Sequence, residues 1–232
     1  MKIGIMQPYF FPYIGYWQLI NAVDIFVVYD NIKYTKKGWI NRNRFLQNGK
    51  DTLFSLAIKN DSDYKNINER FVSDAFDRKK LLSRLRSAYA EAPYFSLVMP
   101  LIENIVYGTE QNLFEYIYNS IIDICLFLKI DTKIVISSSI NIEHSLCSSE
   151  KVKAICKALG GKQYINPIGG LELYDKQDFF NDKLELKFIK SRDIFYRQFD
   201  NDFVPSLSIV DVMMFNSASQ ISSKLLLEYD MI

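Results

Sequence analysis

Short, almost continuous apolar runs alternate with helical patterns along most of the chain. The first two runs are Ile3–Met6 and Ile25–Tyr29, and a helical stretch that begins near Trp17 joins them. Strands that are covered on both faces have this composition, which is typical of a parallel sheet. Strand, helix and parallel strand form a right-handed crossover. We therefore expect the two runs to be neighbours in one sheet, with Tyr13–Tyr16 opening the helix between them.

The same alternation returns in the second half of the chain. Further strands are predicted at 52–58, 133–138, 163–166 and 184–188. Apolar residues at helical spacing predict a helical insertion over 74–130, whose longest helix is capped by Thr109, and a helical C-terminal segment over 205–232. We expect one α/β domain over 1–232, built on a Rossmann-like parallel sheet.

Composition and charge narrow the classes of partner. Hydrophobic residues make up 49% and charged residues 24%, and the net charge is +1, so no global field recruits nucleic acid or an anionic membrane. No apolar run approaches the roughly 20 residues of a membrane span, and the first residues lead into a strand without a targeting segment. Three cysteines without CxxC spacing are typical of reduced thiols, which predicts a cytoplasmic protein.

The loop after the first strand carries the first candidate residues. It reads Gln7-Pro8-Tyr9-Phe10-Phe11-Pro12 and leads into the helix. Ligands of α/β folds bind beyond the carboxyl ends of parallel strands, so this loop is a predicted ligand-binding segment. Gln7 could hydrogen-bond a substrate hydroxyl or amide, or it could cap the helix. Gly15 allows the backbone to approach a ligand or the neighbouring strand closely.

Two more strand ends carry candidate residues. Asp30 ends the second strand, where a carboxylate could hold a metal ion, a ribose or an amine, or act as a general base. The alternative is a turn residue in front of Asn31. Asn166 and Gly169 follow the strand 163–166 and could complete the pocket, although turn formation explains them equally.

The segment 31–44 is basic, polar and aromatic together. Lys36, Arg42 and Arg44 could clamp a diphosphate, because a guanidinium pairs with phosphate oxygens through two hydrogen bonds. The alternative is a solvated basic loop. Asn41 and Asn43 flank Arg42, and this density of polar donors favours a binding role.

The lone histidine and the cysteines offer a weaker alternative. His144 lies in a polar loop after the predicted strand 133–138 and could be a general base or have no chemical role. Cys147 could be a nucleophile beside it. One histidine and three scattered cysteines give no zinc-ligand spacing, and no Walker, G-x-G-x-x-G or G-x-S-x-G motif occurs.

Four segments together resemble the WbqC-like family of bacterial polysaccharide gene clusters. They are Ile5–Tyr16, Asp24–Asp30, Trp39–Asn43 and Leu207–Asp211, in this order, and they span nearly the whole chain. The resemblance implies a role in building surface glycans such as O-antigen. It also implies transfer of glycine or another acyl group to an amino sugar.

A second resemblance is to the nucleotidylyltransferase superfamily, whose HxGH signature follows the first strand. Tyr13-Ile14-Gly15-Tyr16 stands where that signature would stand, and both histidines are replaced by tyrosine. The resemblance implies a nucleotidylyltransferase-like fold. With a pKa of about 10, tyrosine stays neutral and offers a phosphate no positive charge.

These observations lead to one expected function and two alternatives. The leading function is a transferase that moves an acyl or aminoacyl group to a nucleotide-linked amino sugar, with an acyl or aminoacyl donor as the second substrate. Asp30 would be the base and Asn41 or Gln7 the oxyanion donor. Arg42 and Lys36 would hold the diphosphate. Tyr13 and Tyr16 would contact phosphate or sugar, or they would pack within the fold.

The first alternative is nucleotidyl transfer with Mg²⁺ at Asp30. The second is a non-catalytic protein that binds a glycan or a partner through its aromatic surface. No other cofactor is expected, and a homodimer stays open.

Overall fold

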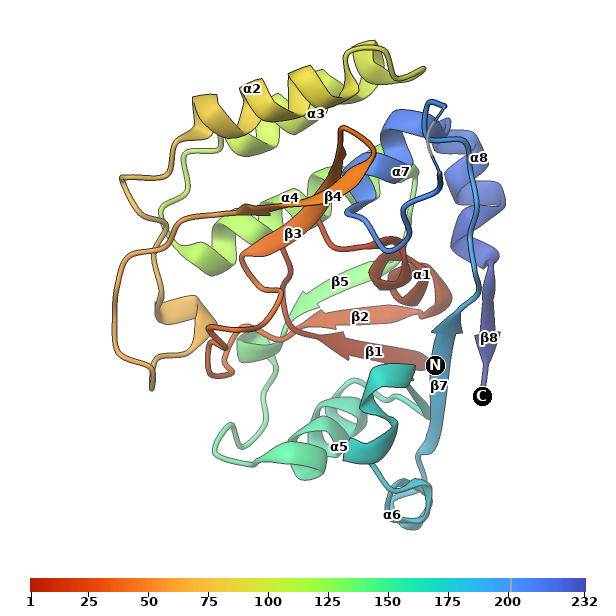
Figure 1. Cartoon of the computed structure of the whole chain (residues 1–232). Coiled ribbons are helices and arrows are strands. Elements are labelled where there is room, and N and C mark those ends of the chain that lie inside the picture. The colour runs from red at the N-terminus through yellow and green to blue at the C-terminus, as the bar shows by residue number, and fades with distance from the viewer. Residues whose placement is uncertain (201) are drawn as a thin grey trace.

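The computed structural model describes residues 1–200 and 202–232, and a six-stranded sheet forms its centre (Figure 1). The strand order is β5-β2-β1-β6-β7-β8. The strands are β1 (Lys2–Met6), β2 (Ile25–Val28), β5 (Lys133–Ile136), β6 (Gln163–Pro167), β7 (Glu185–Ser191) and β8 (Tyr229–Met231). All neighbours are parallel except β7 and β8, which are antiparallel.

The predicted crossover between the first two strands is confirmed. β1 pairs with β2 in parallel, with Ile3 opposite Ile25 and Met6 opposite Val28. The helix α1 (Ile14–Ala22) joins them, and Tyr13 is its N-cap residue. All four residues of β2 are buried, as their continuous apolar run predicted.

The direction in which strands are added to the sheet reverses at β1. From β1 the chain adds β2 and β5 on one side, and it then adds β6 and β7 on the other side. The point between the carboxyl ends of β1 and β6 is therefore a topological switch point. Open α/β sheets bind their ligands at such points.

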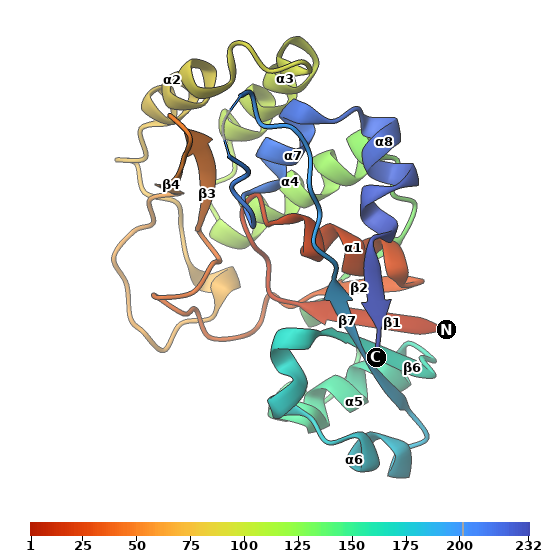
Figure 2. The same cartoon turned by 45° about the vertical axis from the view of Figure 1, so that its right-hand side comes forward.

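Helices cover both faces of the sheet. The helices α4 (Leu113–Leu128), α7 (Ile209–Phe215) and α8 (Ala218–Ser223) lie on the face of α1, above the sheet in Figures 1 and 2. The helices α5 (Ser148–Ala158) and α6 (Lys176–Asn181) lie on the other face. Each face has its own hydrophobic core.

A two-stranded hairpin stands apart from the central sheet. Its strands are β3 (Arg42–Gln47) and β4 (Lys50–Ser55), and two further helices, α2 (Arg78–Tyr89) and α3 (Phe95–Val106), lie near it in Figure 1. Asn48 and Gly49 form its turn with positive φ angles of 53° and 72°. Asn-Gly is the preferred pair for such a turn, because both positions need positive φ. The predicted strand 52–58 is thus the second half of a hairpin, and residues 42–44 begin its first half.

Two sequence-based boundaries differ from the structure. Asn112, not Thr109, caps α4, because its side-chain oxygen accepts hydrogen bonds from the backbone N–H groups of Phe114 and Glu115. The C-terminal segment is helical only as far as the short 3-10 helix η4 (Leu225–Leu227). The chain then pairs with the free edge of β7 as β8. Among the described residues, no helix combines the length and hydrophobicity needed to cross a bilayer.

Candidate functional site

A cavity of about 410 Å³ lies at the switch point, and we call it the switch-point cavity. Met6 and Gln7 line it from the end of β1, Tyr29 follows β2, and Asn166 belongs to β6. Its other walls come from Val152 of α5 and from the 3-10 helix η3 (Ile168–Leu173), which includes Gly169 and Gly170. Three of the sequence-predicted residues, Gln7, Asn166 and Gly169, therefore come together in one cavity.

Aromatic rings and amide groups form much of the cavity wall. The rings belong to Tyr9, Tyr29, Tyr164 and Tyr174. The hydroxyl of Tyr164 donates a hydrogen bond to Asn166 Oδ1 over 2.9 Å, and Asn166 Nδ2 donates to the carbonyl oxygen of Pro167 over 3.2 Å. These two bonds fix the orientation of the Asn166 amide at the wall.

Gly170 makes room for this amide. A Cβ atom at Gly170 would overlap the Asn166 side-chain nitrogen, whereas a Cβ atom at Gly169 would meet no described atom within 4 Å. The second glycine of the pair is thus the one that the amide requires.

A second cavity of about 360 Å³ adjoins the first through Tyr9, and we call it the hairpin cavity. Its lining includes Tyr13, Asn43 and Arg44. Arg44 Nη1 pairs with Asp51 Oδ2 over 2.9 Å, and its guanidinium lies 5.3 Å from the centre of the Trp39 ring. Three further sequence-predicted residues therefore gather here rather than at the switch point.

The loop between the cavities is held from two sides. Phe11 has a φ of 48°, which is strained for a bulky residue. Its carbonyl oxygen accepts hydrogen bonds of 2.8 Å from Asn43 Nδ2 of β3 and from the Ser208 hydroxyl. The backbone N–H of Ile209 donates to Pro12 over 3.0 Å. Asn43 thus lines the hairpin cavity and also fixes the loop that separates the two cavities.

Gly15 and Tyr16 support the start of α1. The Tyr13 ring folds back over Gly15, where a Cβ atom would overlap it. Tyr16 is only 2% exposed, and its hydroxyl donates a hydrogen bond to the carbonyl oxygen of Gln7 over 3.0 Å. Burial raises the pKa of Tyr16 well above the ordinary value. Of the two tyrosines, only Tyr13 is exposed to a ligand.

Asp30 is buried, with 1% of its surface exposed. Its Oδ1 accepts hydrogen bonds from the Ser137 hydroxyl (2.7 Å) and the Ser138 backbone N–H (2.9 Å), and its Oδ2 accepts one from Asn68 Nδ2 (2.8 Å). Burial raises the pKa of Asp30, but hydrogen bonds from Ser138, Ser137 and Asn68 bring it below the usual value. Asp30 therefore ties the end of β2 to two distant segments of the chain.

Three further predicted residues form contacts within the protein, namely Asn41, Arg42 and Lys36. Asn41 Oδ1 accepts from the Tyr34 hydroxyl and its Nδ2 donates to the carbonyl of Leu56, each over 2.8 Å. Arg42 donates to the backbone carbonyls of Gly38 (2.9 Å) and Lys37 (2.5 Å). Lys36 pairs with Asp63 over 2.7 Å with 60% of its side chain exposed. These contacts stabilise the loop before β3, and the diphosphate-clamp role stays a prediction.

His144 is part of the loop that precedes α5. Its Nδ1 lies 2.9 Å from Asn31 Nδ2, and its Nε2 lies 3.0 Å from the carbonyl oxygen of Ile140. The two partners require Nε2 to carry the proton and Nδ1 to accept from the amide. Both ring nitrogens thus have partners within the protein, one of them on the segment after β2, which favours the alternative that His144 has no chemical role.

Sequence reasoning missed Lys151. It is 5% exposed and lies beside the end of β2, where its ammonium donates to the carbonyl oxygen of Asn31 over 3.4 Å. Lys151 is one helical turn before Ile155, a residue of the buried face of α5. A lysine at the edge of an apolar helix face was the signal that could have found it.

A magnesium site finds little support in the side chains present. In residues 1–200 and 202–232, no group of three or more His, Cys, Asp or Glu side chains could hold a metal ion. The neighbours of the Asp30 carboxylate are hydrogen-bond donors, whereas Mg²⁺ needs further oxygen ligands. An Mg²⁺ ion at Asp30 would have this one carboxylate, and most of its other ligands would have to be water or substrate oxygens.

Comparison with known proteins places the chain in a family. A protein of Mycobacterium tuberculosis named "Uncharacterized protein Rv1507c" is 24% identical over 226 residues, which cover 94% of this chain and 95% of that protein. No solved structure gives a significant match. The profile of the WbqC-like protein family matches residues 7–223, which include Gln7, Asn166 and every described residue of the hairpin cavity. The chain belongs to the WbqC-like protein family.

Proposed function

We propose that this protein is an enzyme of bacterial surface-polysaccharide biosynthesis. It binds a nucleotide-linked amino sugar in the switch-point cavity and transfers an acyl or aminoacyl group to the sugar amine. The observation that carries the proposal is the position and lining of this cavity, between the carboxyl ends of β1 and β6 with tyrosine rings and two amide side chains in its walls. Membership of the WbqC-like family agrees with this function.

The size and chemistry of the two cavities suit such a ligand. Small-molecule sites usually measure about 300–1,000 Å³ and combine apolar walls with a few polar groups. Tyrosine rings can cover a sugar or a base, while the amides of Gln7 and Asn166 can fix hydroxyl or carbonyl groups. The adjoining hairpin cavity could hold the acyl donor next to the acceptor.

In acyl transfer, Gln7 and Asp30 would have different roles. The amine attacks the acyl carbonyl, and the oxyanion that forms needs hydrogen-bond donors. The bond to the donor's carrier group then breaks, and that group leaves with the proton lost by the amine. We assign the hydrogen bond to the oxyanion to Gln7, which lines the cavity, because both amide atoms of Asn41 are already hydrogen-bonded. We assign Asp30 a positioning role, since its oxygens already accept three hydrogen bonds in a buried site.

Nucleotidyl transfer is less well supported by the residues at the signature positions. Tyr16 stands at the second histidine position, yet it is buried and its hydroxyl is bound to the Gln7 carbonyl.

A cytoplasmic location is also part of the proposal. It is supported by Cys125, Cys147 and Cys156, which are free thiols.

Ligand binding and turnover test the proposal together. A nucleotide-linked amino sugar should raise the melting temperature of the wild type, because a ligand that binds only the folded state stabilises it. Gln7→Ala and Asn166→Ala should weaken binding about tenfold each, whereas Asn104→Ala, in a different cavity, should leave it unchanged. Mass spectrometry of the sugar after incubation with acyl donors should show the added acyl group.

Other outcomes would identify the alternatives. Release of pyrophosphate from a nucleoside triphosphate in the presence of Mg²⁺ would establish nucleotidyl transfer instead. Stabilisation by a glycan without turnover of any donor would establish a binding protein.

A further inference from the structure

Two buried lysines on α5 have opposite surroundings. Lys153 is 4% exposed, and its ammonium pairs with Glu150 (2.6 Å), Asp178 (2.9 Å) and Asp182 (2.9 Å). Lys151 is 5% exposed, yet no carboxylate oxygen of the described residues lies within 4.0 Å of its ammonium. The two residues are two positions apart on one helix, so burial alone does not explain the difference.

The contacts of Lys151 leave most of its hydrogen-bonding capacity unused. An ammonium carries three N–H donors. The 3.4 Å bond to the Asn31 carbonyl is the one hydrogen bond that it makes to the described residues, and the Tyr29 ring centre lies 5.1 Å away. A buried cation without an anionic partner costs folding free energy, unless it is paired or loses its proton.

The pKa values of the two lysines shift in opposite directions. Burial lowers the pKa of Lys151, and the nearby charge of Asp30 opposes this shift. For Lys153, the hydrogen bonds to Glu150, Asp182 and Asp178 raise the pKa despite burial. The charge of Lys153 is therefore balanced by its three carboxylate partners. An anion next to Lys151 would stabilise the charged form of that lysine.

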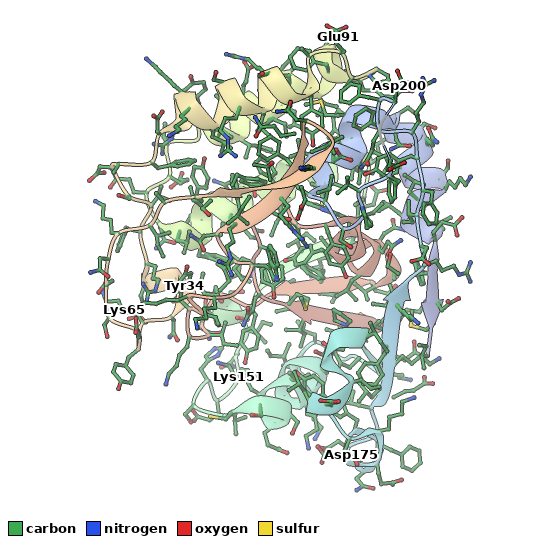
Figure 3. The ribbon with its side chains drawn as sticks, in the orientation of Figure 1. Tyr34, Lys65, Glu91, Lys151, Asp175 and Asp200 are labelled. Carbon is green, nitrogen blue, oxygen red and sulfur yellow. The ribbon has the colours of Figure 1, made fainter. Side chains whose placement is uncertain are left out.

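Lys151 lies next to the switch-point cavity, although it is not itself a lining residue. Its ammonium lies against residues 29–31, and Tyr29, Ile32 and Val152 all line that cavity. Figure 3 shows Lys151 between α5 and the carboxyl ends of β1 and β2. The first turn of α5 begins at Ser148, and its unpaired backbone N–H groups add positive potential at the same edge of the sheet.

We infer that Lys151 binds a phosphate group of the ligand in the switch-point cavity. The inference rests on the proposed function and makes it more specific, because it requires an anionic ligand and names the residue that recognises it. A phosphate oxygen at the cavity wall would accept the N–H donors that Lys151 does not use within the protein. The diphosphate-binding cation is then Lys151 of α5 rather than Arg42 of the hairpin.

Calorimetry with three probes tests the inference. The probes are inorganic pyrophosphate, UDP and UDP-N-acetylglucosamine, each titrated into the wild type, Lys151→Met and Lys153→Met. Methionine keeps the length of the side chain and removes the charge. Lys151→Met should keep the melting temperature and weaken all three probes about tenfold to a hundredfold, because it removes a charge-assisted contact. Lys153→Met should lower the melting temperature and leave the three affinities unchanged.

The outcomes separate the inference from the proposed function. Pyrophosphate binding that depends on Lys151, without any transfer to a nucleotide sugar, would keep the inference and remove the proposed function. Binding of UDP-N-acetylglucosamine that Lys151→Met leaves unchanged would remove the inference alone. If the wild type binds none of the three probes, both the inference and the proposed function are overturned.

A measurement on the wild type covers the case in which Lys151→Met does not fold. Reductive methylation followed by mass spectrometry reports how fast each lysine reacts. Saturating pyrophosphate should slow methylation of Lys151 at least tenfold and leave the exposed Lys157 unaffected. Equal rates of Lys151 methylation with and without pyrophosphate would overturn the inference.

Discussion

Two buried carboxylates show how neighbours set the charge of a residue. Asp30 accepts hydrogen bonds that outweigh the effect of its burial, so its pKa falls below the usual value. Asp211 is 0% exposed and accepts three hydrogen bonds, from Tyr89 (2.8 Å), Tyr196 (2.6 Å) and Gln198 (2.7 Å). Burial nevertheless raises the pKa of Asp211. Relative to an exposed aspartate, the ionised form is favoured at Asp30 and disfavoured at Asp211.

The charge of Asp30 should stabilise the fold in a pH-dependent way. Its pKa is lower in the folded than in the unfolded protein, so its contribution is present above the unfolded pKa and is lost as the pH falls through the folded pKa. Asp30→Asn should lower the free energy of unfolding by about 1.5–3 kcal/mol at pH 7 and by less near pH 3. Urea denaturation at both pH values measures this difference.

Asp131→Asn is the control for this substitution, because Asp131 is exposed and its replacement should change stability by about 0.5 kcal/mol or less. Unchanged stability of Asp30→Asn together with a hundredfold loss of turnover would contradict the positioning role. That result would restore Asp30 as the general base.

The glycine pair of η3 gives a prediction at the scale of one element. Alanine at position 170 would displace the Asn166 amide and break its bonds to Tyr164 and Pro167. Gly170→Ala should therefore lower the free energy of unfolding by about 1–3 kcal/mol and weaken ligand binding in the switch-point cavity. Thermal unfolding and calorimetry with UDP-N-acetylglucosamine provide the two measurements.

Gly169→Ala is the matched control in the same turn. A Cβ atom there meets open space, and neither glycine has a φ in the left-handed region. The substitution should be neutral or stabilise by up to about 1 kcal/mol, because alanine restricts the unfolded chain. Equal losses from both substitutions would show that Asn166 is not the reason for Gly170.

Elements were predictable where the sequence pattern had a local cause. The apolar runs of β1 and β2 and the Asn-Gly turn of the hairpin carry their own signals. β8 carried no such signal, because it exists through pairing with the edge of β7. Its tertiary partner, rather than the propensity of its residues, makes it a strand.

Some residues of the candidate site were likewise predictable from the sequence, and others were not. Gln7, Asn166 and Gly169 follow strands, and the rule for α/β sheets identified them from the sequence. The hydrogen bonds of Asp30 come from Ser137 and Asn68, which are 107 and 38 residues away in the chain, so its burial could not be predicted. Lys151 was missed because a lysine on a helix is normally solvated. Its position one turn before Ile155 was the one hint in the sequence, and the packed structure shows that it is buried.

At the scale of the whole molecule, Asp211 connects separate parts of the fold. It belongs to α7, and its partners come from α2 and from the segment between β7 and α7. The Tyr89 hydroxyl also accepts a hydrogen bond from the backbone N–H of Leu46 in β3 over 3.0 Å. One buried carboxylate thus links the hairpin, α2, α7 and the segment between β7 and α7.

Removing one donor from Asp211 should destabilise the protein more at high pH than at low pH. A raised folded pKa means that the contribution of Asp211 to stability is complete below the unfolded pKa and is lost as the pH rises. Tyr196→Phe raises this pKa further, because it removes the 2.6 Å hydrogen bond. The loss in free energy of unfolding should be about 1–3 kcal/mol at pH 8 and clearly smaller at pH 4.

Tyr107→Phe serves as the control, because Tyr107 is 49% exposed. It should change the free energy of unfolding little at either pH. A loss from Tyr196→Phe that is identical at pH 4 and pH 8 would show that Asp211 keeps one protonation state across this range.

The order of the strands also has a consequence for the newly made chain. β1 is synthesised first but lies in the middle of the sheet, and Ile3 pairs with Tyr164, on the order of 160 residues later. At about 5–20 residues per second, a ribosome needs roughly 8–32 s to supply that partner. During this interval one side of an apolar strand has no neighbour. A chaperone that shields the nascent chain should therefore raise the yield of folded protein more than one that acts after release.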